Sequence, residues 1–341
     1  MDVKCASRVA GMALFVSVTG LSVSAQSART HKAKVTPATA AWGFFNAIKP
    51  VLTVNSGDTV EIETVLEAAE TMRRLGVDEK WITDEMRAID QVTDRGPGGH
   101  LLFGPLAVQG ALPGDVLEVR IKDIKVREPF ALNVFRPGGG TLPADFPVAR
   151  TAVIPLDIKA NVARFAGTTI PLHPFFGVLG VAPPVMTGRV GSGPPGYYAG
   201  NLDNKDLVAG TTLYIPVHAA GALLFLGDGH AGQGDGEVDG TAIECSLIGT
   251  FELIVRKDMK LYWPRAETPT HFMTMGFSED LDEAARMATH EMVVFLSDRF
   301  QLSAEDAYML ASMAADLHVT QNVDRVKGIH ATIAKAIFGA R

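Results

Sequence analysis

The stretch that most constrains this fold is a short apolar run followed by a loop rich in glycine and acidic residues. Residues 223–226 are all apolar and predict a buried strand that ends at Gly227. From there to residue 244, ionisable side chains are separated almost entirely by glycine and small residues. Glycine lets the backbone approach a ligand closely, and crowded ionisable groups are costly unless they are paired, solvated or bound to a cation. The stretch therefore predicts a functional site at a strand end.

Four residues of this stretch carry the expected chemistry. Asp228 and His230 are two residues apart, so in a continuing strand their side chains point to the same face, as two metal ligands would. Glu244 lies in the apolar segment that follows, where an unpaired carboxylate would be expensive. Glu244 and Glu237 are alternative candidates for a general base.

The loop also has structural and catalytic interpretations that need no metal-activated water. A solvated turn is the commoner origin of a glycine- and aspartate-rich loop. The spacing of a calcium loop is not met from Asp228 or from Asp235, and the run GQGDGEVDG does not recur as a β-roll would require. Cys245 has no sequence neighbour that would activate it as a nucleophile, and no G-x-S-x-G elbow occurs. A metal-activated water fits the residue types better.

Strand patterns dominate the chain up to residue 264. Residues 116–126 alternate apolar and charged side chains, which predicts a half-exposed strand with Glu118 on its polar face. Residues 59–64 predict a second strand, and residues 65–75 have helical spacing that Gly76 could end. The 34 glycines and 19 prolines suit a turn-rich β protein.

Helical periodicity replaces strand patterns near the C-terminus. Ser278 is expected to cap a helix with one apolar stripe, and Ser303 opens a capping box for a second helix running to about Asp316. Four methionines of this region are expected in the core: Met287, Met292, Met309 and Met313.

We therefore expect a mostly β protein with α elements (α+β), with β-sandwich or barrel-like regions and a C-terminal helical segment. The predicted division of the chain is a signal peptide (1–25), a flexible N-terminal segment (26–41), an N-terminal β-rich region (42–128), a β region carrying the site (129–264) and a C-terminal helical segment (265–341).

The N-terminus predicts export to the periplasm or secretion. Lys4 and Arg8 precede a short apolar run, and residues 23–25 offer small side chains for cleavage. The alternatives are a short N-terminal anchor or a disordered tail, although the run is too short to span a membrane. Cleavage would remove Cys5 and leave Cys245 alone, so no intramolecular disulfide could form. The net charge of −7 disfavours nucleic acid as a partner, and no membrane association is expected after cleavage.

Further candidates lie in other glycine-rich segments. His100 follows the run D-R-G-P-G-G, where a histidine is often merely exposed, and Asp203 lies in a segment where aspartates more often make local turn bonds. Asn201 and Phe176 are predicted to contact the substrate.

Several blocks of the sequence resemble the acetamidase/formamidase family. The segment GALLFLGDGHAGQGDGEVDGTAIE, preceded by AGNLDNKDLVAGTTLYIPV, is similar to the signature region of that family. The likeness extends from about Trp42 to Phe338 through four more blocks: DRGPGGHLLFGPLAVQGALPGDVLEVRI, FRPGGGTLPADFP, IPLHPFFGVLGVAPP and DAYMLASMAADLHVTQNVDRVKGIHA.

The resemblance implies an amidohydrolase that acts on the C–N bond of small linear amides and releases ammonia and a carboxylic acid. A divalent metal would polarise the amide carbonyl and activate water, with Glu244 or Glu237 as the base. We expect zinc, with calcium as an alternative, and a homo-oligomer. The expected ligands are His100, Asp228, His230 and Asp203. A secreted, non-catalytic small-molecule-binding protein on the same scaffold and a calcium-stiffened structural module are the alternatives.

Overall fold

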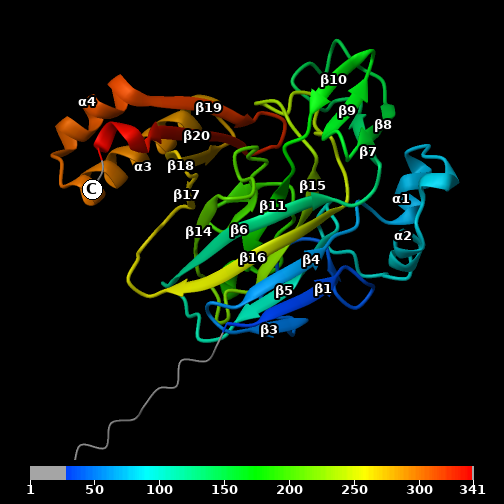
Figure 1. The fold of residues 1–341 in the computed structure, drawn as a ribbon, viewed down its shortest axis with the longest axis horizontal. Helices are drawn as coiled ribbons and strands as arrows, with labels where there is room; N and C mark the ends of the chain where they lie inside the picture. The colour runs from blue at the N-terminus through cyan, green and yellow to red at the C-terminus, as the bar shows by residue number, and fades with distance from the viewer. Residues whose placement is uncertain (1–27, 340–341) are drawn as a thin grey trace, which may run out of the picture.

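The computed structural model describes residues 28–339, so the predicted signal peptide lies outside the described residues. The strands form three sheets, of nine, seven and four strands, and a few helices lie at their edges (Figure 1). This arrangement confirms the expected mostly β fold with α elements and C-terminal helices. Among the described residues, no helix has both the length and the apolar character needed to cross a membrane.

The nine-stranded sheet runs in the order β1-β4-β16-β6-β14-β17-β18-β20-β19. Its strands are β1 Thr30–Lys34, β4 Thr59–Glu63, β16 Leu247–Arg256, β6 Val116–Val126, β14 Thr212–Pro216, β17 Arg265–Glu267, β18 His271–Ser278, β20 Lys327–Ala334 and β19 Ala315–Gln321. All neighbours are antiparallel except β1 and β4. The bounds of β6 match the alternating segment that predicted it.

The seven-stranded sheet carries the glycine-rich stretch. Its order is β12-β13-β11-β15-β5-β2, with β3 paired to β5. Its strands are β12 Pro195–Gly196, β13 Ala199–Asn201, β11 Phe175–Val181, β15 Leu224–His230, β5 Leu102–Val108, β2 Ala40–Ala41 and β3 Leu52–Val54. The four-stranded sheet projects from the main body and consists of β10 Thr168–Pro171, β9 Val162–Phe165, β8 Arg150–Asp157 and β7 Phe130–Phe135 (Figure 1).

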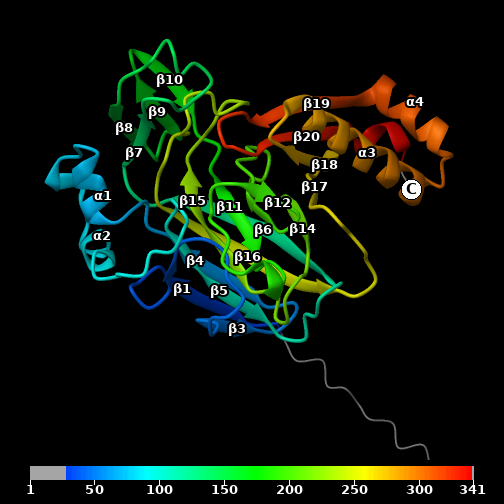
Figure 2. The same ribbon diagram turned by 180° about the vertical axis from the view of Figure 1, so that it is seen from behind.

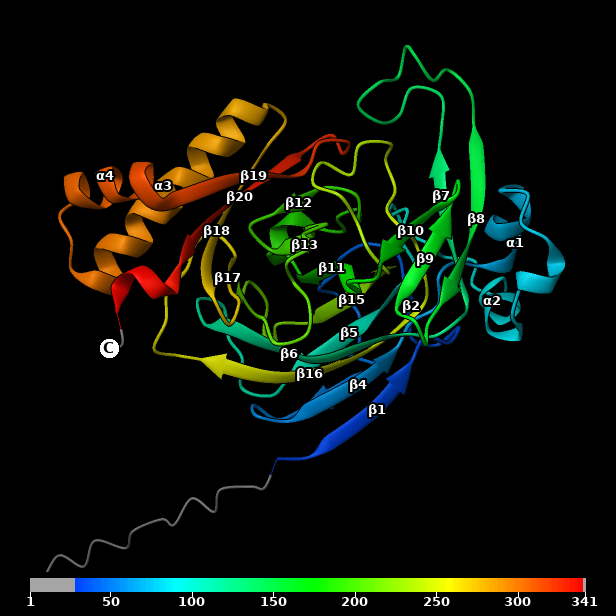
Figure 3. The ribbon, with the colours of Figure 1, turned by 45° about the horizontal axis from the view of Figure 1, so that its top comes forward.

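The two large sheets pack face to face. Phe176 of β11 contacts Phe251 of β16 with ring centroids 5.4 Å apart, so aromatic side chains join the two layers. Figure 3 shows β6, β16, β4 and β1 curving beneath β11 and β15, and Figure 2 shows β11 and β15 near the centre of the molecule. One continuous apolar core spans both sheets. The expected sandwich-like region is therefore present, and β15 lies inside it.

The helices are short except at the C-terminus. The α-helices are α1 Ala69–Arg74, α2 Asp84–Ile89, α3 Leu281–Phe300 and α4 Ala304–Ala314, and the 3₁₀ turns are η1 Glu79–Trp81, η2 Val185–Thr187 and η3 Lys335–Phe338. The helix predicted over 65–75 is the shorter α1. Asp280, not Ser278, caps α3 by accepting the Glu283 N–H, whereas Ser303 caps α4 as predicted.

Helices α3 and α4 cover the β18–β20 end of the large sheet with a second apolar core (Figure 1). Ala307 and Ala311 bring α4 close to its neighbours, and Met292 is buried in α3. The prediction that Met309 and Met313 are core residues is wrong, because they lie on the opposite face of α4 and are 61% and 74% exposed.

Two segments and one residue differ from what the sequence predicted. Residues 26–41 were expected to be flexible, but β1 pairs with β4 and β2 with β5. The charged strand β1 gave no apolar signal because it lies at the sheet edge. Residues 265–341 contain four strands as well as two helices. Glu118 is 2% exposed, not on a solvated face, because Arg120 and Arg256 donate to its two oxygens at 2.6 Å.

Candidate metal centre

The glycine-rich stretch forms the end of β15 and the loop that follows it. Strand β15 pairs with β11 so that His230 lies opposite Phe175. Glu244 returns beside β15 through an isolated bridge to His230. Asp203 follows β13 on the other side of β11. Strand β15, the segment that returns beside it and the loop after β13 therefore bring their carboxylates to one imidazole.

His230 is the centre of this cluster. Its Nε2 lies 3.2 Å from Glu244 Oε2, 3.4 Å from Asp228 Oδ2 and 4.0 Å from Asp203 Oδ1. Glu237 joins Asp203 and His230 in a group whose potential ligand atoms lie within 4.8 Å of one another, and Asp228, His230 and Glu244 form a second such group. The predicted Asp228–His230 pair and both candidate bases therefore meet at one place.

Gly177 of β11 leaves room for the cluster. A Cβ at this position would lie 2.5 Å from Asp203 Oδ1 and from Asp228 Oδ2, and 2.9 Å from His230 Cε1. Any side chain here would occupy the space between the three groups. Gly177 has no distinguishing signal in the sequence, because its importance depends on β13 and β15 lying on either side of β11.

Three carboxylates of the cluster lie on strained backbone. Asp203, Asp228 and Glu237 have φ values of 45°, 55° and 47°, a left-handed conformation uncommon for residues other than glycine. Residues held in this way cluster at active sites and cost of order 1–3 kcal/mol each. Six other non-glycine residues of the described chain share this conformation outside the cluster, so the assignment of these three rests on their contacts with His230 and with one another.

His100 and Asp324 approach the cluster from two further loops. The backbone N–H of His100 donates to Ser192 Oγ at 3.1 Å, while its ring Nδ1 is buried without a hydrogen-bond partner in the described chain. Asp324, between β19 and β20, was missed by the sequence analysis. Asn201, a predicted substrate contact, donates to Asp324 Oδ2 at 2.7 Å. The only sequence signal for Asp324 was its place in a family-like block.

Phe176, the predicted substrate contact, is not the aromatic ring that lies beside His230. Phe176 points into the core between the sheets, where it contacts Phe251. Its neighbour Phe175 faces the opposite side of β11 and packs edge-on against the His230 ring, with centroids 4.9 Å apart. Because successive strand residues face opposite sides, Phe175 is the residue placed to hold the imidazole.

Burial and neighbouring charges shift the pKa values of the clustered carboxyl groups in opposite directions. Burial raises the pKa of Asp203 well above its usual range, and the nearby Asp228 adds to that rise. Burial likewise raises the pKa of Glu237, and Asp203 increases the effect. Burial also opposes ionisation of Asp228, but His100 and His230 outweigh it and lower its pKa. The pKa values of neighbouring carboxyl groups are therefore shifted in opposite directions.

The two imidazoles and Asp324 respond to the same crowding. Burial alone would lower the pKa of His230, but Glu244 and Asp228 raise it well above its ordinary value. Burial would also lower the pKa of His100, but Asp228 and Asp203 outweigh it and raise that pKa. Burial raises the pKa of Asp324 to about 6 despite the Asn201 hydrogen bond.

These residues fit a divalent metal. Within residues 28–339, no lysine or arginine forms an ion pair with a carboxylate of the cluster, and Asp203 Oδ1 is buried without a hydrogen-bond partner. Uncompensated buried carboxylates are costly unless a cation neutralises them. Imidazole nitrogen with carboxylate oxygen is a donor set that zinc accepts, whereas calcium prefers oxygen alone.

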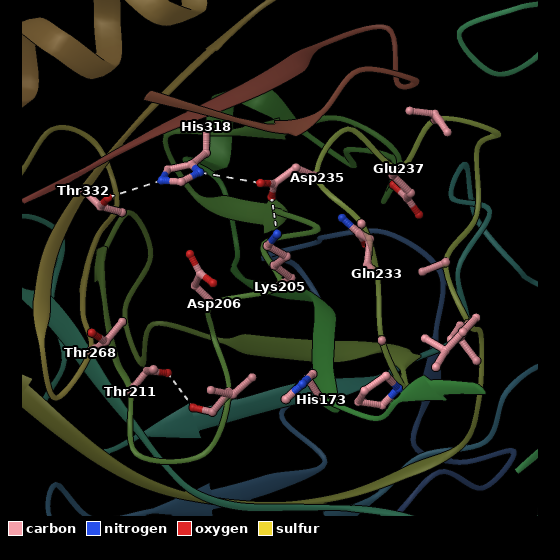
Figure 4. Close-up of a pocket in the computed structure, with 18 of the residues that line it drawn as sticks. His173, Lys205, Asp206, Thr211, Gln233, Asp235, Glu237, Thr268, His318 and Thr332 are labelled. Carbon is pink, nitrogen blue, oxygen red and sulfur yellow. Dashed lines mark hydrogen bonds and ion pairs between the residues drawn. The ribbon is translucent and has the colours of Figure 1, made fainter. Parts of the chain in front are cut away.

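A cavity of about 1140 Å³ adjoins the cluster. Gln233 and Glu237 lie along one side of it, and Lys205, Asp235 and His318 lie along another (Figure 4). Lys205 Nζ lies 3.0 Å from Asp235 Oδ1, and His318 Nδ1 lies 3.5 Å from Asp235 Oδ2. These three polar groups are therefore paired with one another. Of the carboxylates clustered around His230, Glu237 is the one that lines the cavity.

The family model described as the Acetamidase/Formamidase family matches residues 15–187 and 190–340. An acetamidase structure from Bacillus halodurans is 36% identical with a TM-score of 0.76, covering 89% of this chain and 98% of that one. One from Yersinia enterocolitica is 28% identical with a TM-score of 0.80, covering 93% and 95%.

Curated relatives match over shorter spans. The formamidase of Methylophilus methylotrophus is 26% identical over 219 residues, which is 48% of this chain and 51% of that protein. The chain spans about half to three-fifths of the length of the curated relatives that it matches.

Proposed function

Because this chain belongs to the acetamidase/formamidase family, we propose that it is a metal-dependent hydrolase of small linear amides, releasing ammonia and a carboxylic acid. The observation that carries the proposal is the convergence of Asp203, Asp228 and Glu244 on His230 without a lysine or arginine partner in the described chain. Amide carbonyls are poor electrophiles, so their hydrolysis near neutral pH needs both activation of the carbonyl and a positioned base.

Four residues are proposed to hold the metal: Asp228, His230, Asp203 and His100. A divalent cation bound by them would supply Lewis acidity towards the amide carbonyl and towards water. Zinc fits the mixed nitrogen and oxygen donors better than calcium. Phe175 packs against the His230 ring and excludes water from that side. Gly177 leaves the space in which the donor atoms converge.

Glu244 is the better candidate for the base. Its side chain is 13% exposed, so water can reach it, and the Ala242 N–H donates to Oε1 at 2.7 Å while Oε2 faces the cluster. Glu237 is more deeply buried, and burial raises the pKa of its carboxyl group. Glu244 is therefore the proposed acceptor of the proton from water, and Glu237, beside the cavity, is the alternative base.

The cavity beside Glu237 is the proposed substrate compartment. Its volume of about 1140 Å³ is comparable to the largest pockets that hold whole drug-sized ligands, and therefore far exceeds what formamide or acetamide needs. Apolar side chains such as Ile154, Phe165 and Ile243 line it together with polar ones. An amide series of increasing acyl length would establish how much of this space the substrate uses.

The test combines metal analysis with an ammonia-release assay on formamide and acetamide. We expect stoichiometric zinc in purified protein, loss of ammonia release after dialysis against a chelator, and recovery on adding zinc but not calcium. Full activity in the chelated protein would rule out metal dependence. Zinc binding without ammonia release from any amide would instead indicate a binding protein.

A further inference from the structure

Gln233 connects the cluster to two distant segments of the chain. Its side-chain amide has one end 2.7 Å from the Asp203 carbonyl oxygen and 3.3 Å from the Thr320 carbonyl oxygen. The other end lies 3.0 Å from His230 Nδ1. One side chain therefore contacts the loop that carries Asp203, strand β19 and the imidazole at the centre of the cluster.

These contacts fix the orientation of the amide. Carbonyl oxygens only accept hydrogen bonds, so the end of Gln233 that faces Asp203 and Thr320 must be the NH₂ group. The end that faces His230 is then the amide oxygen, which also only accepts. It follows that His230 Nδ1 carries a proton and donates a hydrogen bond to the Gln233 amide oxygen.

The consequence is that Nε2 is the ring nitrogen left for a ligand. It faces the oxygens of Asp228, Glu244 and Asp203 at 3.2–4.0 Å, on the side away from Gln233. A metal-binding histidine commonly depends on such an acceptor at its other nitrogen, which fixes the tautomer and the ring orientation. Without an acceptor at Nδ1, the ring could place its proton on Nε2 or turn.

We propose that Gln233 is a positioning residue that holds His230 with Nε2 directed into the metal centre, and that the Thr320 carbonyl holds Gln233 in turn. The proposal rests on the proposed metal site. It also gives the β19–β20 hairpin a role, because Thr320 and the neighbouring Gly236–Gln321 bridge join the hairpin to the Glu237 loop.

Two substitutions separate positioning from simple packing. Gln233→Leu removes the acceptor at His230 and both donors to the carbonyls. Gln233→Glu keeps an acceptor at His230 but removes the same two donors. If Gln233 positions the ring, zinc affinity measured by competition with a chromogenic chelator should fall about 10–100-fold in Gln233→Leu. It should fall clearly less in Gln233→Glu, because an acceptor for His230 Nδ1 remains even though a carboxylate oxygen now faces the Asp203 and Thr320 carbonyls without a proton to donate.

The opposite pattern would overturn the proposal. If Gln233 only joins loops, both variants lose the same two bonds, and their zinc affinities and melting temperatures should fall together. Thr320→Val is the matched control, because it removes the Oγ contact with His330 at 2.7 Å but keeps the carbonyl. Its zinc affinity should match wild type, and a loss equal to that of Gln233→Leu would also refute the proposal. Because affinity is measured without substrate, failure of amide hydrolysis would not obscure the result.

Discussion

Adding one methyl group at Gly177 tests whether the clustered side chains act as one metal centre. In Gly177→Ala the new Cβ would lie 2.5 Å from Asp203 Oδ1 and from Asp228 Oδ2, whereas ordinary contacts begin near 3.4 Å. Each carboxylate must therefore retreat by about 0.9 Å, the difference between these distances. A misplacement of about 1 Å at a reacting centre can lower turnover roughly 10²-fold. We expect a loss of that size, together with weaker zinc binding.

The fold should tolerate this substitution. Gly177 does not have a left-handed φ, and the two closest atoms that the methyl group meets are carboxylate oxygens at the ends of side chains. The third, His230 Cε1 at 2.9 Å, requires a shift of about 0.5 Å in the imidazole, and no backbone atom is among the three. The melting temperature of the metal-free protein should therefore change little. Gly180→Ala, on the same strand, is the control, because its Cβ would lie 2.6 Å from the Gly200 backbone nitrogen. That variant should lose stability, since backbone cannot move aside as a carboxylate can.

Zinc titration and ammonia release, each measured beside a thermal melt, give the answer. If Gly177→Ala binds zinc and turns over amide as wild type does, Asp203 and Asp228 are not ligands of a shared metal. If it unfolds as readily as Gly180→Ala, the side chains around Gly177 cannot move to accept the methyl group, and the substitution does not report on the metal centre alone.

The remaining predictions concern a carboxylate of the cluster, a distant buried aspartate and the N-terminus. Glu244→Gln should lower turnover roughly 10²–10⁴-fold with zinc content and fold intact, and loss of zinc would make Glu244 a ligand instead. Burial disfavours ionised Asp58, but the N–H groups of Arg29 and Asn55 and the His31 ring outweigh it and lower its pKa to about 2. Because the folded pKa lies below the unfolded value of 3.8, this stabilisation is present above about pH 4 and is lost as the pH falls towards 2. Asp58→Asn should cost about 1–2 kcal/mol in urea unfolding at pH 7 and flatten that acid dependence, and parallel pH profiles would contradict the assignment. Mass spectrometry of protein from its native host should find a chain that begins after Ala25, and recovery of Met1 would refute export.

Local patterns predicted local features well. The alternation over residues 116–126 gave the bounds of β6, and the capping box at Ser303 gave the start of α4. The i, i+2 spacing of Asp228 and His230 placed both side chains at one point. Each of these features depends on residues within a few positions of one another. Over that range, backbone geometry alone determines which way each side chain points.

Features that depend on distant contacts were missed. Gln233 matters because Thr320, 87 residues away, accepts its hydrogen bond, and Asp324 because Asn201, 123 residues away, holds it. Glu118 is buried because Arg256, 138 residues away, donates to it. Neither periodicity nor composition contains these pairings, since sheet order alone brings the segments together. Phe175 and Phe176 show the remaining difficulty, because one step along a strand decides which ring meets His230.

The left-handed backbone at Asp203, Asp228 and Glu237 has a consequence for anyone who tries to evolve this protein in the laboratory. Glycine or asparagine relaxes such a backbone, so replacing any of the three residues should make the metal-free chain more heat-resistant. A library selected for survival at high temperature without a turnover screen would therefore enrich these replacements first. The most thermostable clones would be the ones that had lost the carboxylates of the proposed active site.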